Sequence, residues 1–496
     1  MNIDKILATY KGGGTSSFHP RMMLKVIVYG YTQKIYTNRR IAKAIREQIP
    51  FMWLSGGNRP DFRTIAHFRS SRLKGTIEEV FTSVMKLLLE SNLVRLEDYY
   101  LDGTKLEANA SRYSYVWKKS VNRYEAGLQA KLKVLLKEID RQNKSEDLEY
   151  GDRDLEELGE DSHVSSDQIE KLLTELEEKL SLRPKDKNLK KSVKVLKKDI
   201  LPRQQKYEKQ REILGDRTSY SKTDPDATFM RMKEDHLKNG QLKPGYNIQI
   251  GVTDQFILHY SIHQSAGDAS LLKPHIEGLR ERYVFLPDRV IADAGYGSEE
   301  NYEYLKGLGL EAFVKYPGFD REMKRKIKND PYRRENLAYD AEKDAFICPN
   351  GKQIVFSYNR VRESKNGYKS LVSVYECEDC RGCPLKSKCF RGKGNRIINV
   401  NHRLDKLRKE ARALLDSEIG QYYRRRRLAE VESVFAQIKN RDFRRFHVRG
   451  LDNVNMEFGL AHNFMKWAAI LKKKYENSGI FLSLFTISKK PLLQFV

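Results

Sequence analysis

The stretch 288–297, DRVIADAGYG, decides the fold. Its centre, VIAD, is a short apolar run that ends in an acid and is followed by glycines, which predicts a buried strand running into a tight turn. The residues after it, NYEYLKGLGL (301–310), predict a helix that ends at glycine, and EAFVKY (311–316) predicts another strand. Open α/β sheets bind ligands beyond the carboxyl ends of their strands, which is where Asp293 falls.

Three further strands are expected earlier in the chain. DYYLDGT (98–104) predicts a short strand with Asp102 near its end. PGYNIQIGV (244–252) and QFILHYSIH (255–263) alternate with a period of two, which predicts neighbouring strands of one sheet, and a helix follows at about 269–283. This order of strands and helices is typical of an α/β core.

A late helix supplies a third acid. YYRRRRLAEVESVFAQIK (422–439) contains Glu432, and the carboxylates of Asp102, Asp293 and Glu432 can converge. Hard divalent cations such as Mg²⁺ prefer oxygen ligands, so a few carboxylates and a substrate phosphate make a suitable site. Two such ions can generate the nucleophile, stabilise the leaving oxygen and neutralise the charge of an in-line displacement. We expect these acids to hold two Mg²⁺ or Mn²⁺ ions and to catalyse phosphoryl transfer.

The composition favours a polyanionic partner. The chain has 496 residues, with 92 Lys and Arg against 67 Asp and Glu, a formal net charge of +25. Nucleic acid is the leading candidate, and the length predicts two or three structural units. The sequence begins with no signal pattern and has no apolar run near the ~20 residues of a membrane span. We expect a cytoplasmic, nucleoid-associated protein with no membrane partner.

Basic residues are concentrated in the first 95 residues, which predict a compact module of short helices. The helix DFRTIAHFRSSR (61–72) turns Ile65 and Phe68 inward and leaves its arginines for phosphate. The DNA contacts expected from this module and from the late helix are Arg39, Arg40, Arg63, Arg69, Arg72, Arg426 and Lys439.

All five cysteines lie between residues 348 and 389. In a reducing compartment such clustering favours zinc over disulfides, and a closed Cys₄ site would be structural. The expected ligands are Cys348, Cys380, Cys383 and Cys389, with Cys377 as the alternate. Reduced free thiols are the other interpretation.

These pieces, in this order, resemble the bacterial insertion-sequence transposases of the DDE type. The resemblance covers roughly residues 20–470, and its motifs are LDGTKLEAN, TDPDATFMRMK, KPGYNIQIGV, VIADAGYGS, VESVFAQIKNRDFRRFHVRGL and the N-terminal NRRIAKAIREQIPFMWLSGGNRPDFRTIAHFR. It implies a ribonuclease H-like core with the first acid on the first strand, the second on the fourth and the third on a late helix. It also implies DNA substrates, namely the terminal inverted repeats of the transposon and the target, and a homodimer that joins two ends.

The family signature around the last acid is Tyr, two residues, Arg, three residues, Glu, six residues, Lys. Its second half is matched by Glu432, Phe435 and Lys439, although Leu428 and Arg425 then stand at the Arg and Tyr positions. Its first half is matched by Tyr423, Arg426 and Glu430, although Gln437 then stands at the Lys position. Two residues along a helix correspond to about 200° of rotation, so only one glutamate can face the site. We choose Glu432 and keep Glu430 as the rival.

The expected architecture is an α/β protein with a ribonuclease H-like mixed sheet. An N-terminal helical DNA-binding domain (1–95) precedes a catalytic core (96–316 and 401–475), and the insertions are mostly helical (105–240) and cysteine-rich (317–400), with a C-terminal tail (476–496). The expected activity is metal-dependent cleavage at transposon ends and transfer of the 3′-hydroxyl into target DNA. The alternatives are a metal-dependent nuclease without strand transfer and a catalytically silent, transposase-derived DNA-binding protein.

Overall fold

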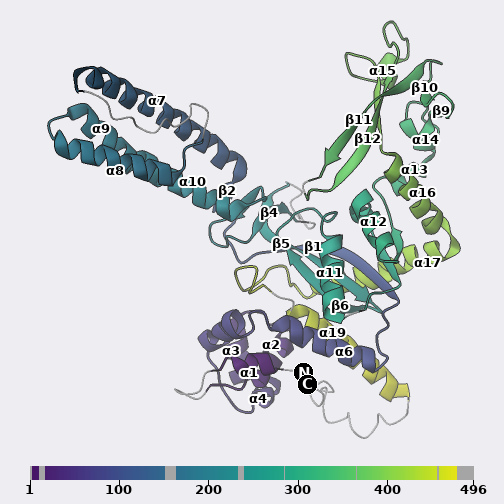
Figure 1. Ribbon diagram of the computed structural model, residues 1–496. Helices are drawn as coiled ribbons and strands as arrows, with labels where there is room; N and C mark the ends of the chain where they lie inside the picture. Colours follow the sequence, from purple (N-terminus) through teal and green to yellow (C-terminus); the bar gives the residue numbers. More distant parts are fainter. Residues whose placement is uncertain are drawn as a thin grey trace. The chain divides into compact units, whose positions relative to one another are not determined.

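The computed structural model (Figure 1) describes residues 3–10, 17–150, 163–232, 240–283, 285–364, 366–454 and 457–477. The chain divides into two compact units. The first consists of Met1–Leu106, Asn247–Val448 and Asp452–Val496, and the second of Glu107–Tyr246 and Arg449–Leu451. The tail expected at 476–496 lies outside the described residues beyond Asn477.

A mixed sheet forms the centre of the first unit. Its strands lie in the order β6-β5-β1-β7-β8. Strands β1, β7 and β8 are parallel, whereas β5 and β6 form an antiparallel hairpin. The strand bounds are β1 (Asp98–Glu107), β5 (Leu242–Thr253), β6 (Phe256–His263), β7 (Arg289–Ala292) and β8 (Glu311–Val314). The sheet confirms the mixed α/β class predicted from the sequence.

The register of the parallel strands brings two acids to the same edge of the sheet. Leu101 of β1 pairs with Ala292 of β7. The next residues are Asp102, which lies within β1, and Asp293, which directly follows β7, so the register places these acids side by side. Both strands are apolar and buried up to this point, which fixes their position.

Gly251 allows a close approach inside the sheet. A Cβ atom at this position would lie 1.7 Å from the hydroxyl oxygen of Tyr99, so only glycine leaves room for that ring. Tyr99 is fully buried, and its hydroxyl hydrogen-bonds His275 at 2.7 Å. The central strand is thereby tied to α11.

Helices flank the strands of the first unit. α11 (Leu272–Tyr283) contacts β6, α12 (Glu299–Gly307) and α16 (His402–Asp416) contact β8, and α17 (Glu418–Arg427) contacts β7 and β8. α17 runs through a π-helical turn, Leu428–Glu432, into α18 (Ser433–Asn440). This continuous helical segment carries the predicted third acid.

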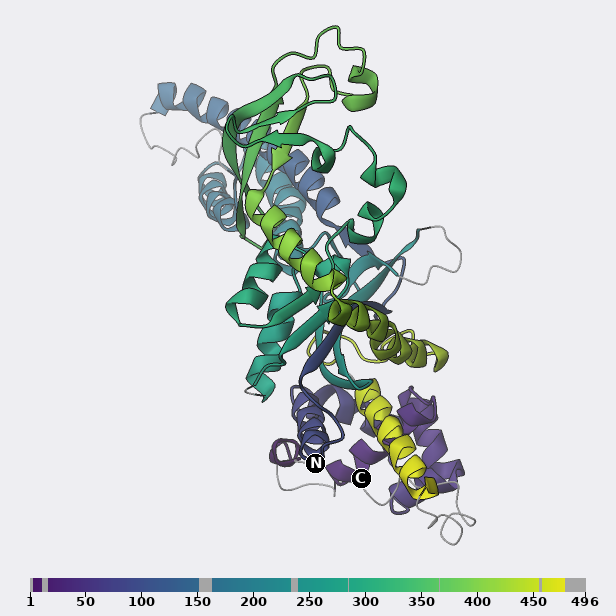
Figure 2. The same cartoon turned by 90° about the vertical axis from the view of Figure 1, so that its right-hand side faces the viewer.

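The N-terminal helices pack with the last described helix. α19 (Glu457–Asn477) lies against α2, and both views show it beside the N-terminal helices (Figures 1 and 2). The helices of this group are α1 (Asp4–Ala8), α2 (Pro20–Thr32), α3 (Asn38–Glu47), α4 (Ile49–Leu54), α5 (Phe62–His67) with the π-helical turn Phe68–Arg72, and α6 (Ile77–Glu90). None of the helices in the described ranges combines the length and the apolar character that a bilayer crossing requires.

A cysteine-rich β-segment follows β8. Its five strands are antiparallel and lie in the order β13-β12-β11-β10-β9. A small apolar core of Ile354, Tyr375, Ile398 and Val400 also contains two cysteines, Cys377 and Cys380. The element bounds are α13 (Phe319–Glu322), α14 (Arg325–Lys328), β9 (Ala338–Asp340), β10 (Ala345–Ile347), β11 (Gln353–Glu363), β12 (Lys369–Cys377), α15 (Lys386–Cys389) and β13 (Ile397–Val400).

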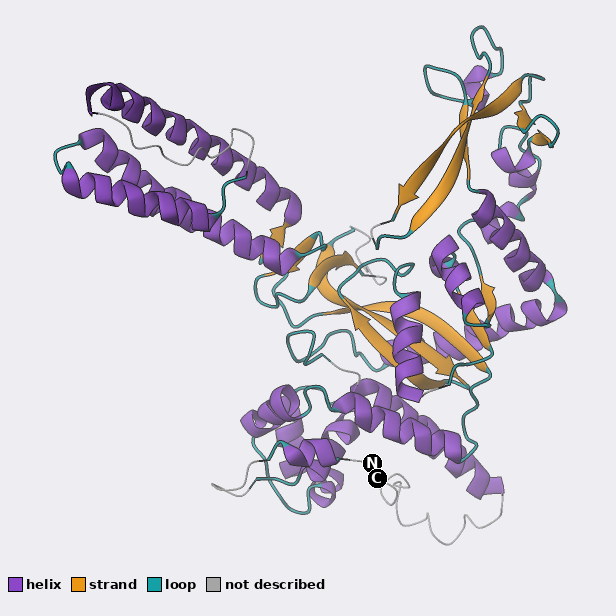
Figure 3. Ribbon diagram, in the orientation of Figure 1, coloured by secondary structure: helices purple, strands orange, loops and turns teal. Residues whose placement is uncertain are grey.

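The second unit is mostly helical (Figure 3). Its apolar core includes Ile169, Leu173, Leu176, Leu196 and Ile200. The element bounds are β2 (Tyr115–Trp117), α7 (Lys118–Tyr150), α8 (Ser166–Leu182), α9 (Lys187–Val195) with the π-helical turn Leu196–Ile200, α10 (Leu201–Leu214), β3 (Ser219–Ser221) and β4 (Thr228–Arg231). β4 pairs with the start of β5, with Thr228 opposite Gly245.

Candidate catalytic centre

Asp102 and Asp293 are held in the same way. The backbone N–H of Gly103 donates to Oδ1 of Asp102 at 2.7 Å, and the N–H of Gly295 donates to Oδ1 of Asp293 at 2.8 Å. In each acid Oδ1 is therefore fixed by a backbone N–H just after it, that of Gly103 within β1 and that of Gly295 in the turn after β7.

Both Oδ2 atoms face one cationic nitrogen. Nη2 of Arg427, the last residue of α17, lies 2.8 Å from Oδ2 of Asp102 and 4.0 Å from Oδ2 of Asp293. The Asp102 side chain is 10% exposed and that of Asp293 is 43% exposed. The two acids therefore meet at one point at the margin of the solvent, where a cation is already held.

Asp268 is a third carboxylate at this point, and the sequence analysis missed it. Its Oδ1 accepts hydrogen bonds from Nδ2 of Asn247 at 2.7 Å and from Nε2 of Gln249 at 3.1 Å. The Tyr296 hydroxyl donates to Oε1 of the same Gln249. The sequence did contain a sign of this site, because the amide residues Asn247 and Gln249 occupy alternate positions of β5, a strand that is buried along most of its length.

Tyr296 lies within the electrostatic influence of all of these groups. Burial raises the pKa of the Tyr296 hydroxyl well above its usual value, and the negative charges of Asp102, Asp268 and Asp293 raise it further. The charge of Arg427 lowers it. Tyr296 therefore stays protonated and can donate its hydrogen bond to Gln249.

The structure places the two candidate third acids differently. Glu430 is buried and accepts a hydrogen bond from the backbone N–H of Gln255 at 2.6 Å and another from Nε of Arg426 at 3.2 Å. Burial raises the pKa of its carboxyl, while the Gln255 hydrogen bond and the Arg426 charge lower it. Glu432 is exposed. Glu430 thus supports the β5–β6 turn, and neither glutamate joins Asp102 and Asp293.

The π-helical turn Leu428–Glu432 changes how residues align along this segment. A π turn takes five residues where an α turn takes about four, so a pair five apart across it is oriented much as a pair four apart in an α-helix. Arg427 and Glu432 are five apart and span the turn. The spacing from Arg427 to Glu432 in the π turn is therefore geometrically similar to the Arg-to-Glu spacing of the family signature.

The predicted DNA contacts of the N-terminal helices are exposed with one exception. Arg39, Arg40 and Arg63 are exposed, and Arg72 is partly exposed. The guanidinium groups of Arg39 and Arg63 lie 4.8 Å and 5.7 Å from the centre of the Phe62 ring. Together they form a basic surface with an aromatic centre, of a kind that can contact phosphate.

The structure corrects the expectation that Arg69 faces DNA. It is 1% exposed, and Glu457, Tyr31, Tyr36 and Asn38 accept its hydrogen bonds. A guanidinium buried in the protein needs partners for its donors, and here those partners come from α2, α19 and the segment before α3. Arg69 is therefore a structural residue.

The two predicted contacts of the late helix are partly exposed. Arg426 is 37% exposed and pairs with Asp254 at 3.1 Å and with Glu430 at 3.2 Å. Its charge is thus partly compensated within the protein. Lys439, in α18, is partly exposed.

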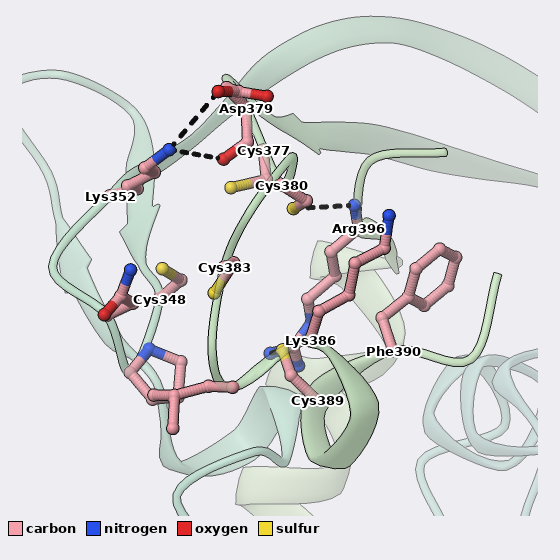
Figure 4. A pocket seen from close by; sticks show the side chains of 13 residues that line it. Cys348, Lys352, Cys377, Asp379, Cys380, Cys383, Lys386, Cys389, Phe390 and Arg396 are labelled. Carbon is pink, nitrogen blue, oxygen red and sulfur yellow. Dashed lines mark hydrogen bonds and ion pairs between the residues drawn. The ribbon is translucent and has the colours of Figure 1, made fainter. Parts of the chain in front are cut away.

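All five cysteines line one pocket (Figure 4). The backbone N–H of Arg396 donates to Sγ of Cys380 at 3.3 Å, and its Nη1 donates to Sγ of Cys389 at 3.0 Å. Burial, together with the neighbouring Cys380 and Cys348, raises the pKa of Cys377 to about 12. Over the described ranges, no group of three or more His, Cys, Asp or Glu side chains is arranged to hold a metal ion.

Comparison with protein families gives two matches. A family described as Transposase DDE domain matches residues 347–468, and one described as Transposase domain (DUF772) matches residues 1–71. No curated protein matches the chain. The first match contains Glu430, Glu432 and the cysteines, whereas Asp102 and Asp293 lie between the two matches.

Proposed function

We propose that this chain, a member of the insertion-sequence transposases of the DDE type, cuts DNA at transposon ends and joins the freed 3′-hydroxyl to target DNA. The observation that carries this proposal is the convergence of Asp102 and Asp293, whose Oδ2 atoms lie 2.8 Å and 4.0 Å from Nη2 of Arg427. The family supplies the transposase function, and these two acids supply a place for its chemistry.

The donor set suits a hard divalent cation. Arg427 acts as a stand-in cation between the acids, and its Nε is buried with no hydrogen-bond partner in the described part of the chain. Asp102 and Asp293 would hold Mg²⁺ or Mn²⁺, and Glu432, which does not join them in the described structure, is proposed to complete the site when metal and DNA bind. When bound, two such ions would supply an activated nucleophile and charge neutralisation at the scissile phosphate.

The chain's own residues orient this chemistry. The N–H groups of Gly103 and Gly295 fix one oxygen of each acid, so the other oxygen keeps its direction without reorganisation. Arg427 must leave its place for a metal to enter, and its freed guanidinium is then available to a DNA phosphate. No covalent link between enzyme and DNA is needed.

We assign the third acid to Glu432. Glu430 is committed to the β5–β6 turn, and removing its charge would uncouple Arg426 and Gln255. Glu432 is exposed on the segment next to Arg427, so it is accessible to metal and DNA. Glu432→Gln is expected to abolish catalysis with the fold intact, whereas Glu430→Gln is expected to lower stability.

The test is a strand-transfer assay with purified full-length protein, Mg²⁺ or Mn²⁺, and DNA that carries the element's ends. Asp102→Asn and Asp293→Asn should each lower product formation on the order of 1,000-fold, because each removes a ligand worth several kcal/mol to the transition state. Asp405→Asn is the control, since Asp405 pairs with Arg334 on α16. Cleavage without joining of a pre-cut end would identify a nuclease, and excision unaffected by Asp293→Asn would identify a silent DNA-binding protein.

DNA binding is assigned to Arg39, Arg40, Arg63 and Arg72 of the N-terminal helices and to Lys439 and Arg426 of the late helix. These residues are exposed or partly exposed, and the net charge of +25 favours phosphate contacts. The partners are the terminal inverted repeats and the target DNA, bound by a homodimer that holds two ends. Arg63→Ala should weaken DNA binding and reduce its salt dependence.

The cysteine pocket is assigned to structural Zn²⁺. Its support is the convergence of five sulfurs in a segment whose apolar core is small. The proposed ligands are Cys348, Cys380, Cys383 and Cys389, with Cys377 as the alternate. Elemental analysis should find one zinc per chain that is lost in Cys383→Ser and kept in Cys377→Ser, and a zinc-free wild-type protein would refute the assignment.

A further inference from the structure

Asp268 lies in the loop between β6 and α11, and it is not one of the three predicted acids. Two amide side chains, those of Asn247 and Gln249, donate to its Oδ1 at 2.7 Å and 3.1 Å. Both amides are 0% exposed. Buried amides are unfavourable unless they are hydrogen-bonded, so this pair is best explained by the carboxylate that it holds.

The Asp268 carboxylate lies beside the glycines that follow the two acids. A Cβ atom on Gly103, directly after Asp102, would lie 2.9 Å from Oδ1 of Asp268. A Cβ atom on Gly295, two residues after Asp293, would lie 3.0 Å from Oδ1 of Asp293 and 3.9 Å from Oδ2 of Asp268. Asp268 is therefore close to the backbone next to both acids.

The charge in this group is unbalanced. Asp102, Asp268 and Asp293 all act electrostatically on Tyr296, and Arg427 acts on it with the opposite sign. Among these groups, three carboxylates stand against one guanidinium. A divalent cation in place of Arg427 would compensate more of this charge, which is the condition under which a cluster of partly buried acids is stable.

We propose that Asp268 is a positioning residue that strengthens divalent-cation binding by Asp102 and Asp293. Fixed by Asn247 and Gln249, its carboxylate adds negative charge beside the two acids and accepts hydrogen bonds from the waters that a hard cation keeps. The inference rests on the proposed function, because it requires that Asp102 and Asp293 bind a metal.

A purely structural role for Asp268 makes a different prediction. Its backbone oxygen accepts a hydrogen bond from the N–H of Leu271 at 2.9 Å, just before α11 begins. This contact is made by the main chain, so it survives any change of the side chain. If the carboxylate served only the loop, its replacement would change thermal stability and leave metal affinity unchanged.

The test measures Mn²⁺ binding to the full-length protein by isothermal titration calorimetry and by electron paramagnetic resonance. Asp268→Asn keeps the shape of the side chain and should weaken Mn²⁺ binding roughly 10- to 100-fold, as loss of a residue that supports metal ligands does. Asp405→Asn is the matched control and should bind Mn²⁺ as the wild type does. Wild-type affinity in Asp268→Asn would overturn the inference.

Two further variants separate the possible failures. Asp102→Asn should lose Mn²⁺ binding, and if it does not, the metal site of the proposed function itself is refuted. Asn247→Ala should weaken Mn²⁺ binding in the wild type and have no further effect in an Asp268→Asn background, because it acts through that carboxylate. If the two changes weaken Mn²⁺ binding additively, the positioning role of Asp268 is overturned. If Asp268→Asn does not fold, the Mn²⁺ affinity of Asn247→Ala alone tests that role.

Discussion

Replacing Arg69 by Met removes one half of an ion pair that is buried on both sides. The side chains of Arg69 and Glu457 are 1% and 2% exposed, and Nε of Arg69 donates to Oε1 of Glu457 at 2.8 Å. Loss of the arginine takes the guanidinium away from the buried carboxylate of Glu457 and leaves the carbonyl oxygen of Tyr36 without this donor. Breaking a buried pair from one side costs about 3 to 5 kcal/mol, and we expect a loss of this size.

The assay is hydrogen–deuterium exchange of the full-length protein, read at the amides of α2 and α19. A loss of 3 to 5 kcal/mol corresponds to local opening that is more frequent by on the order of 10²- to 10³-fold. Arg63→Met is the matched control, because Arg63 is exposed on the neighbouring α5 and should change exchange little. Equal exchange in the two variants would refute the reasoning.

The double variant Arg69→Met/Glu457→Met tests the same reasoning from the other side. It removes both charges, so the uncompensated carboxylate disappears. The remaining cost is the loss of polar partners, about 1 to 3 kcal/mol for a buried group, because the Tyr31 hydroxyl bonds both Arg69 and Glu457 in the wild type and the Tyr36 carbonyl oxygen still lacks its donor. The double variant should therefore exchange more slowly than Arg69→Met alone, and faster exchange would contradict the ion-pair explanation.

Three further predictions concern the centre and the sheet. Gly103→Ala would place a Cβ atom 2.5 Å from Nε2 of Gln249, so this variant should bind metal more weakly and carry out less strand transfer. Gly267→Ala is the control, because a Cβ atom there meets open space and should change neither property. Equal effects of the two variants would contradict this packing. Arg427→Gln removes the cation that competes with metal, so Mn²⁺ affinity measured by calorimetry should rise about 10-fold, and a fall would show that Arg427 does not occupy the metal position. Burial lowers the pKa of His263 from 6.5 to about 4, so the unfolded chain takes up the proton first as the pH falls. The contribution of His263 to the free energy of unfolding is therefore complete above pH 6.5 and falls by about 3 kcal/mol toward pH 4. The urea-unfolding free energies of the wild type and His263→Gln should converge at low pH.

The two strands that carry Asp102 and Asp293 could be predicted from local sequence. Apolar runs followed by Asp indicated both strands, although β1 continues through Asp102 to Glu107, and the parallel pairing of Leu101 with Ala292 places the two acids on neighbouring strands. The third acid could not be settled in this way. A π-helical turn at Leu428–Glu432 changes the rotation of every residue after it, and nothing in the residue types of that segment predicts the turn.

Arg69 and Asp268 show two other limits of prediction from sequence. Arg69 lies four residues after Ile65, on the inward face of its helix, but residue type suggested solvent, and its counter-ion is Glu457, 388 positions away. Asp268 lies in a loop without periodicity, so its role depends on Asn247 and Gln249 of another strand. In both cases the decisive partner is distant in the chain.

The packing of α19 on α2 has a consequence for synthesis. During translation the N-terminal helices emerge first, and Arg69 has no carboxylate to meet until the ribosome has made Glu457. The buried face of α2 and the guanidinium of Arg69 therefore complete their contacts only once residues 457–477 have been made and α19 has formed.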